Sequence, residues 1–374
     1  VAFEFLGRES SKPFASAVSF VFASFVSHWR MHYKESFEAY VDAERWGLEL
    51  GDMPHTTYAA AISTQRWFFV GRPLDSCEAK VDAATATLKQ AGAQNQLNGV
   101  VFVQRAMARL RGTPRDQALL RDESEADFTE RLRASKNAQW LFLYGHSQLL
   151  VSLVLGDLAG AEAWNDFTAS YLLAGGKIHF SVTDQYLLDT LICSRRCRSL
   201  PEAEQSKAFE RMAANEAQLE IWAKSCPANF AHKHKFASAE LARARGEALH
   251  VVLSLYTEAI AAAGDDFVHL RALINERLGE YWLEAGQAKI AQLYFGEAYA
   301  LYESWGAAAK LRQLRQTHPA LFEAGKQAWR AGAITLHEHR TDIVHGSALD
   351  LESMIKATRA ISGRCPPAAT RSSA

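Results

Sequence analysis

The sequence predicts an all-α fold, an α-solenoid in which antiparallel helical hairpins stack into a superhelix. Only nine prolines and 22 glycines occur in 374 residues, and nearly all lie between segments whose apolar residues recur at helical spacing. These segments are about 15 to 20 residues long and the turns between them are short, which predicts helices that pack as antiparallel neighbours. No segment alternates in the manner of a β-strand.

The expected helices follow one another with few gaps. In the first, Phe22, Phe25 and Trp29 recur at helical spacing and are expected to share one face. Glycine or proline marks most later boundaries, and Asp75 is placed to cap one helix at its N-terminus. The later helices are expected at residues 33–50, 54–70, 75–92, 97–111, 137–155, 158–174, 180–197, 201–224, 227–245, 249–263, 270–285, 287–305 and 307–316.

The clearest internal repeat lies near the end of this array. Its small residues allow two helices to approach closely, its rings fill the remaining space, and the offsets are those of a tetratricopeptide repeat (TPR). Weaker copies surround Gly246 and Gly156. The predicted fold is therefore a TPR-like α-solenoid, with each hairpin packed mainly on the hairpins before and after it. The signature residues are Leu278, Gly279, Trp282, Gly286, Ala291, Phe295, Ala298, Tyr302, Trp305 and Gly306.

Composition and charge exclude several classes of function. With 41 basic and 42 acidic side chains the net charge is −1, so no electrostatic argument favours nucleic acid or an anionic membrane surface. The longest apolar run, Phe14 to Val26, is well short of the ~20 residues that cross a bilayer, and a signal peptide is not expected. Five cysteines suit a reducing cytoplasm. The first residue is Val1 rather than methionine, which indicates an excerpt of a longer reading frame.

None of the short motifs of nucleotide binding, metalloprotease, hydrolase or kinase chemistry occurs in the sequence. Residues 175–177 lack the earlier glycine and the hydroxyl of a phosphate loop and are interpreted as an interhelical turn. His337 and His339 lie two residues apart and would diverge on a helix. The sequence therefore predicts no catalytic residue, no cofactor and no metal, and a chain that is not an enzyme.

Cysteine and histidine residues leave one weaker alternative open. Cys193 and Cys197 are four residues apart on an expected helix and could share a face, but a structural zinc needs two further ligands. Cys226, His232 and His234 could supply them. No sequence argument brings the two groups together, so ordinary packing of the cysteines between helices is favoured.

Tryptophans recur about once per expected helix. Packing between helices accounts for this pattern, and the functional alternative is an aromatic-lined concave groove that captures a peptide. Such grooves also need convergent polar side chains, which the sequence does not locate. The tryptophans concerned are Trp29, Trp46, Trp67, Trp140, Trp164, Trp222, Trp282 and Trp305.

Residues 275–314 carry a resemblance to a known family. The stretch resembles the end of the helical repeat region of large bacterial signalling proteins, with Tyr302, Trp305, Gly306 and Ala307 at the family's signature positions. Segments FVFASFVSHWRMHYKESFEAYVDAERWGLELGD and WFFVGRPLD are similar to the earlier part of that region, and LDLESMIKATRAISG resembles its connector. In this family a serine/threonine-kinase-like domain and a STAND-type AAA ATPase precede the repeats, and a GAF domain and a sensor histidine kinase follow.

The resemblance covers most of residues 12–363 and implies a division of the chain. It departs from the family where residues 364–367 replace the start of the GAF domain, and no catalytic motif of the family falls within the matched stretch. The expected segments are a disordered or partial N-terminal segment at 1–12, a TPR-like helical domain at 13–317, a linker at 318–348, a connector helix toward a missing GAF domain at 349–363 and a disordered tail at 364–374.

Three functions follow as expectations. The resemblance implies a non-catalytic scaffold or sensor segment that couples an upstream ATPase module to a downstream GAF and histidine-kinase module, with protein domains as its partners. The alternative is a free-standing TPR adaptor that binds a peptide in its concave groove. A third alternative is an enzyme with an unrecognised helical active site.

Overall fold

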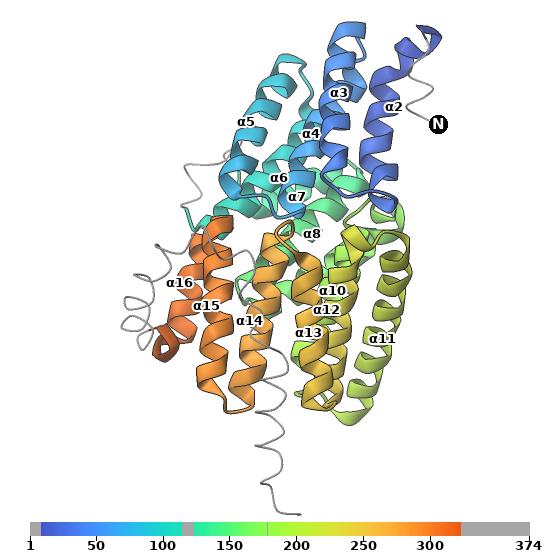
Figure 1. Cartoon of the computed structure of the whole chain (residues 1–374). Helices are drawn as coiled ribbons and strands as arrows, with labels where there is room; N and C mark the ends of the chain where they lie inside the picture. Colours follow the sequence, from blue (N-terminus) through green and yellow to red (C-terminus); the bar gives the residue numbers. More distant parts are fainter. Residues whose placement is uncertain (1–8, 114–122, 178, 323–374) are drawn as a thin grey trace, which may run out of the picture. The chain divides into compact units, whose positions relative to one another are not determined.

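The computed structural model describes residues 9–113, 123–177 and 179–322, and every regular element in these ranges is a helix. The prediction of an all-α fold is confirmed (Figure 1). The α-helices are α2 (Ala15–Val21), α3 (Glu35–Leu50), α4 (Met53–Phe69), α5 (Leu74–Gln90), α6 (Gln94–Arg111), α7 (Glu125–Ala134), α8 (Ala138–Val154), α9 (Leu158–Tyr171), α10 (Val182–Cys197), α11 (Glu202–Ser225), α12 (Pro227–Arg245), α13 (Leu249–Ala263), α14 (Val268–Glu284), α15 (Ala288–Trp305) and α16 (Ala308–Thr317).

Local chemistry accounts for many of the helix ends. Gly51, Gly246 and Gly306 follow helices in the left-handed conformation, with φ of 76°, 70° and 95°, which glycine adopts without steric penalty. At helix starts, side-chain oxygens of Asn137 and Asp157 accept hydrogen bonds from backbone N–H groups of the first turns of α8 and α9. These residues act locally, which is why the helices could be predicted in order.

The predicted N-terminal cap of one helix is wrong, and one further helix was missed. Asp75 does not cap α5, because Pro73 occupies the N-cap position and Asp75 lies inside the first turn. Its carboxylate instead accepts a hydrogen bond from Arg111 of α6 at 2.7 Å. Residues 125–134 form α7, a helix that was not predicted; only Phe128 and Leu132 of its ten residues are buried apolar side chains, too few to show a helical period.

The first expected helix is irregular. After α2 the chain forms a π-helix at Phe22–Val26 and a 3-10 turn at Ser27–Trp29, so the three aromatic residues do not share one face of an α-helix. Phe25 packs on Phe20, whereas Trp29 packs on Phe230 of α12, with ring centres 5.5 Å apart. The packing partner of Trp29 lies far along the chain, where no local pattern could indicate it.

Consecutive helices make the strongest contacts. The pairs α3 and α4, α12 and α13, and α14 and α15 pack side by side, as the short turns predict (Figure 1). Helices α8 and α9 pack in the same way. The small residues of α14 and α15 sit at the closest approach, where a Cβ on Gly279 would lie 2.9 Å from Cδ2 of Phe295. This part of the array has the geometry of a packed hairpin.

Contacts between distant helices go beyond the expected pattern of neighbouring hairpins. Phe68 of α4 lies against Trp305 of α15, with ring centres 6.4 Å apart. A Cβ on Gly71, whose φ is 78°, would collide with the His269 ring of α14. Arg312 of α16 donates a hydrogen bond to the Arg111 carbonyl at 3.3 Å. Each contact joins the first third of the chain to the last part of the array.

Several expectations concern residues outside the described ranges. These are most of the segment 1–12, most of the linker 318–348, the connector 349–363 and the tail 364–374, together with His337 and His339. Residues 9–14, part of them expected to be disordered, form a 3-10 helix. At the other end, residues 319–322 are helical where the linker was expected to begin. None of the described helices is long and apolar enough to cross a membrane.

Candidate functional site

Ionisable side chains gather in the interior of the array, which is the strongest candidate site among the described residues. They come from six regions of the chain and all are buried. Here they are called the buried polar centre, whose members are His28, Tyr33, Arg66, His146, His179, Asp184, His232, Lys233 and His269.

Phe180, which precedes α10, lies in the middle of this cluster. Its ring centre is 4.4 Å from that of His179, 5.6 Å from that of Tyr33 and 6.2 Å from that of His28. The guanidinium carbon of Arg66 lies 3.9 Å from the centre of the same ring. Residues from the α2–α3 segment, from α4 and from the start of α10 therefore surround one aromatic side chain.

One ion pair is fully formed in the centre. The ammonium of Lys233, on α12, lies 2.6 Å from Oδ1 of Asp184, on α10, and donates a hydrogen bond to Thr183 Oγ1 at 2.9 Å. Burial lowers the pKa of Lys233, and the neighbouring carboxylate of Asp184 opposes that shift. Since both charges are buried, each stabilises the other in place of water.

Arg66 has a different environment. Its Nη2 donates hydrogen bonds to the carbonyls of Ala23 at 2.9 Å and Ser24 at 3.2 Å, and its planar group lies against the rings of Phe180 and Tyr33. Nε and Nη1 have no hydrogen-bond partner among the described residues. A permanently charged side chain with two unused donor nitrogens is thus held rigidly in the interior.

The five histidines of the centre are held in their neutral form. Burial lowers the pKa of His146 to about 4, against the opposing charge of Asp184. Burial lowers the pKa of His269 to about 4 as well. For the other three, burial and nearby positive charges lower the pKa well below its ordinary value. Each histidine has at least one ring nitrogen with no hydrogen-bond partner in the described part of the chain, a set that comprises His28, His146, His179, His232 and His269.

Asn229 of α12 joins the first helices to the later ones. Its Oδ1 accepts from the Tyr33 N–H at 3.1 Å, and its Nδ2 donates to the carbonyls of His28 and Met31, both at 2.8 Å. The Tyr33 ring packs on Phe267, before α14, with centres 5.8 Å apart. We call this contact the Asn229 clasp, and it closes the buried polar centre on one side.

The predicted repeat residues form the α14–α15 hairpin and mostly pack within it. Gly286, with φ of 73°, makes the turn, and Tyr302 donates a hydrogen bond to Glu276 Oε2 at 2.8 Å. Trp305 differs, because its ring centre lies 5.3 Å from that of His269 in the buried polar centre. The signature residues with buried side chains are Leu278, Trp282, Ala291, Phe295, Ala298, Tyr302 and Trp305.

The cysteine and histidine residues considered as zinc ligands have different packing partners. Cys193 packs with Met212 and Leu241 in a hydrophobic cluster. His232 stacks on Phe267, whereas His234 binds Glu216 at 2.7 Å. Within the described ranges no group of three histidine, cysteine, aspartate or glutamate side chains is arranged to hold a metal ion.

A second buried network lies between α10, α12 and α14. Glu240 is fully buried and accepts hydrogen bonds from Arg277, at 2.7 and 2.8 Å, and from Tyr256 at 2.6 Å. Burial alone would raise the pKa of Glu240, but the two nearby arginines, Arg277 and Arg243, hold it well below its usual range. Because its donors and acceptors are satisfied, this network is a structural element rather than a binding site.

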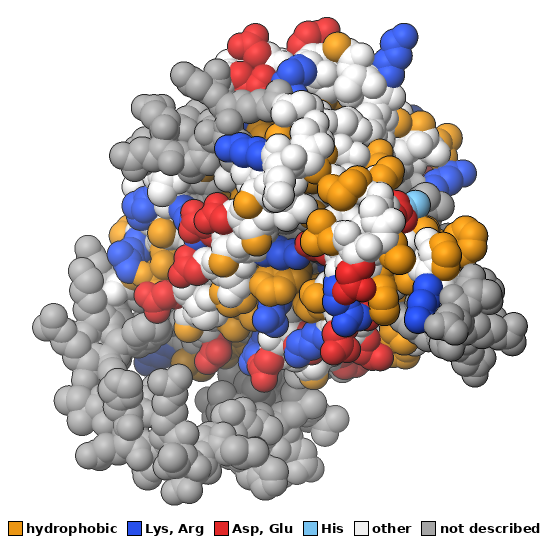
Figure 2. Space-filling view, turned by 90° about the horizontal axis from the view of Figure 1, so that it is seen from above, with side chains coloured by type: hydrophobic (Ala, Val, Ile, Leu, Met, Phe, Trp, Pro, Cys, Tyr) orange, Lys and Arg blue, Asp and Glu red, His pale blue; other side chains and the backbone are white. Residues whose placement is uncertain are grey.

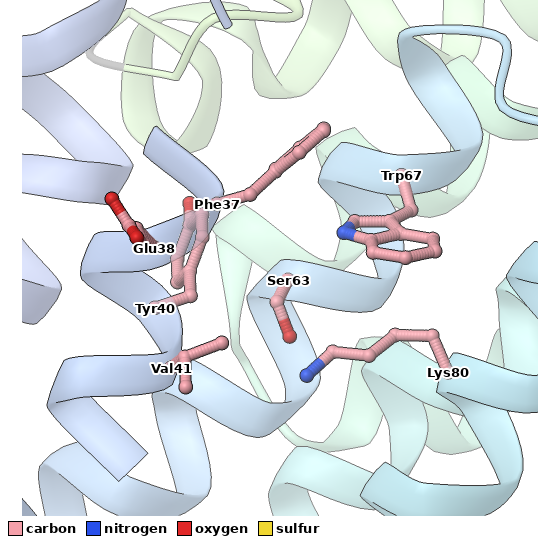
Figure 3. Close-up of a pocket in the computed structure, with 7 residues that line it drawn as sticks. All are labelled: Phe37, Glu38, Tyr40, Val41, Ser63, Trp67 and Lys80. Atoms are coloured by element: carbon pink, nitrogen blue, oxygen red, sulfur yellow. The ribbon is translucent and has the colours of Figure 1, made fainter. Parts of the chain in front are cut away.

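A groove with an aromatic lining lies on the surface of the described helices. It has a volume of about 260 Å³ and lies where α3, α4 and α5 meet (Figure 3). Phe37 and Trp67 pack with ring centres 5.5 Å apart, and Lys80 binds Glu44 at 3.0 Å beside them. Elsewhere, the face shown in Figure 2 has acidic, basic and hydrophobic side chains interspersed, with no broad patch of one charge.

No protein-family model, no curated protein and no solved structure matches the chain. The buried polar centre itself was not predicted from the sequence. One signal could have pointed to it: His146 lies in the middle of α8, a helix that is almost wholly buried and rich in large apolar side chains. A lone histidine in such a helix needs a polar environment from elsewhere in the fold.

Proposed function

We propose that this chain is a non-catalytic helical-repeat segment of a multidomain signal-transduction protein, coupling an ATPase module before it to a GAF and histidine-kinase module after it. The observation that supports the proposal is the Asn229 clasp, which joins the chain at His28 to a side chain 201 residues later. The proposal includes a TPR-like solenoid fold and a cytoplasmic location.

A coupling domain needs two arrangements of similar free energy, of which a ligand or neighbour binds one better. The Asn229 clasp consists of three hydrogen bonds and a few ring contacts. A hydrogen bond contributes only about 0.5–1.5 kcal/mol net to stability. A partner with modest preference for the open arrangement can therefore separate the first helices from α12.

The irregular helices at the start of the array suit such movement. The π-helix and 3-10 turn between Phe22 and Trp29 lack a continuous series of α-helical hydrogen bonds. The backbone of this segment can therefore change its direction at a lower free-energy cost than a regular helix. The resemblance of residues 275–314 supplies the remainder of the proposal, since it alone points to ATPase and kinase neighbours.

The reading frame that encodes the chain provides the first test. We expect an ATPase phosphate-binding loop before the chain and a histidine-kinase phosphoacceptor motif after it. In that full-length protein, Asn229→Ala is expected to change the rate of ATP hydrolysis or autophosphorylation. Arg45→Gln, a change in an exposed pair with Asp42, is the control and should leave both rates unaltered. A start codon and promoter belonging to this chain alone would contradict the proposal.

The second candidate function is a free-standing adaptor that captures a peptide. The groove at Phe37 and Trp67 favours this function, because aromatic rings can pack against apolar side chains of a peptide. Lys80 also lines the groove and can pair with an acidic side chain of the peptide. A peptide array probed with the chain should select sequences that combine apolar and acidic residues. Trp67→Ala should abolish the selection, and Trp46→Ala, outside the groove, should retain it. Equal selection by both variants would exclude the groove as the peptide-binding site.

A further inference from the structure

We propose that the buried polar centre binds a small oxyanion, a molecule with a carboxylate or phosphate group, beside the guanidinium of Arg66. This proposal rests on the proposed coupling function, in which the anion is the ligand that favours the arrangement closed by the Asn229 clasp. The binding itself can be measured without any neighbouring domain.

The balance of charge is the first argument. Three members of the centre are charged side chains: Lys233, Asp184 and Arg66. Lys233 and Asp184 form a pair at 2.6 Å. Arg66 is fully buried and, within the described residues, bonds only to the backbone carbonyls of Ala23 and Ser24. The centre therefore carries one positive charge without a carboxylate, and a buried charge of this kind is costly unless an opposite charge joins it.

The unused donors are the second argument. Arg66 has two donor nitrogens, Nε and Nη1, without a partner among the described residues. Nε2 of His179 and the Tyr33 hydroxyl lack a partner in the same ranges, as do the two ring nitrogens of His28, one of which donates in the neutral imidazole. All four side chains surround Phe180. An oxyanion has several lone pairs and needs no acceptor, so it matches unpartnered N–H and O–H groups that lie around the same ring as a cation.

Burial and the origin of these side chains give the third argument. Arg66, His28 and His179 are completely buried, so the bound molecule must be small and must be enclosed. His28 and Tyr33 lie on the α2–α3 segment that Asn229 holds, whereas Arg66 belongs to α4 and His179 precedes α10. A ligand bonded to His28 and to His179 joins the α2–α3 segment to the start of α10, which packs on α12, and so stabilises the closed arrangement.

The test uses the whole 374-residue chain. Calorimetric titration and thermal melting are carried out with sodium phosphate and with sodium acetate, each compared with sodium chloride at equal ionic strength. Saturable binding of phosphate identifies a phosphoryl ligand, and saturable binding of acetate identifies a carboxylate ligand. A response equal to that of chloride for both anions would overturn the proposal.

Two substitutions place the binding at the centre. Arg66→Gln is expected to weaken binding about tenfold or more, and Tyr33→Phe, which removes one hydroxyl, to weaken it about threefold or more. Arg45→Gln is the matched control on the surface and should bind as the wild type does. If Arg66→Gln does not fold, Tyr33→Phe decides the question alone. Undiminished binding by a folded centre variant would refute the site. Failure to bind either anion would leave the coupling test in the full-length protein unaffected.

Discussion

The side-chain amide of Asn229 binds the backbone of Tyr33, 196 residues away in the sequence, with Oδ1 accepting from the Tyr33 N–H at 3.1 Å. The same amide donates to two further carbonyls of the segment between α2 and α3. One side chain thus satisfies three backbone groups of an irregular segment. This relationship closes the array and determines which side chains meet in its interior.

Asn229→Ala should open this contact. The substitution leaves one buried N–H and two carbonyls without partners, which is expected to lower the free energy of unfolding by about 2–4 kcal/mol. Urea unfolding measures the loss, and amide exchange of residues 28–33 should accelerate while that of α14 and α15 changes less. Asn137→Ala, which removes one capping bond of α8, is the control and should cost about 1 kcal/mol. Unchanged exchange at residues 28–33 would show that Asn229 does not hold them.

Stability should fall as the pH is lowered from about 6.5 to about 4. Burial lowers the pKa of His146 and of His269 to about 4 in the folded chain, below the ordinary value of 6.5. In this window the unfolded chain binds protons that the folded chain excludes, so acid favours unfolding; each residue contributes roughly 3 kcal/mol over the window. The stability is fully present above pH 6.5. Urea unfolding at several pH values checks the slope.

A pair of variants assigns this pH dependence. His146→Gln keeps a polar group beside Gln185 but removes one titrating site, so the slope between pH 6.5 and 4 should decrease. His250→Gln replaces an exposed histidine and should leave the slope as it is. Equal slopes for the wild type and both variants would contradict the role of the buried histidine.

Gly279→Leu should destabilise the α14–α15 hairpin by about 1–3 kcal/mol or more. Even a Cβ at this position lies 2.9 Å from the Phe295 ring, and a larger side chain must displace it. Thermal melting measures the effect. Adding Phe295→Ala should restore part of the loss, because the two positions are in contact. A Gly279→Leu variant that melts at the wild-type temperature would show that the assigned repeat register is wrong.

Arg277→Met should cost about 3–5 kcal/mol, because it leaves the fully buried carboxylate of Glu240 without its ion-pair partner. Replacing both residues, with Glu240→Leu added, removes the uncompensated charge and should recover part of the stability. Urea unfolding of the two variants makes the comparison. A double variant no more stable than Arg277→Met would mean that the remaining charge is not the source of the loss.

Much of the helical pattern could be predicted because its causes are local. Gly51, Gly246 and Gly306 end helices through their own backbone conformation. The prediction failed where a distant group intervened: Asp75 binds Arg111 instead of capping its helix. It failed again at α7, where two buried apolar side chains are too few to reveal a period.

The sequence by itself determined that the chain is helical, where most of its helices begin and end, and which small and aromatic residues let α14 and α15 pack. These properties depend on residues within a few turns of one another. Only the tertiary structure decided that Asn229 meets Tyr33, and that Arg66, Lys233, Asp184 and five histidines share one interior. The physical reason is that such a centre is assembled by closure between distant helices, and each member viewed along the chain is a single polar residue without any periodic signal.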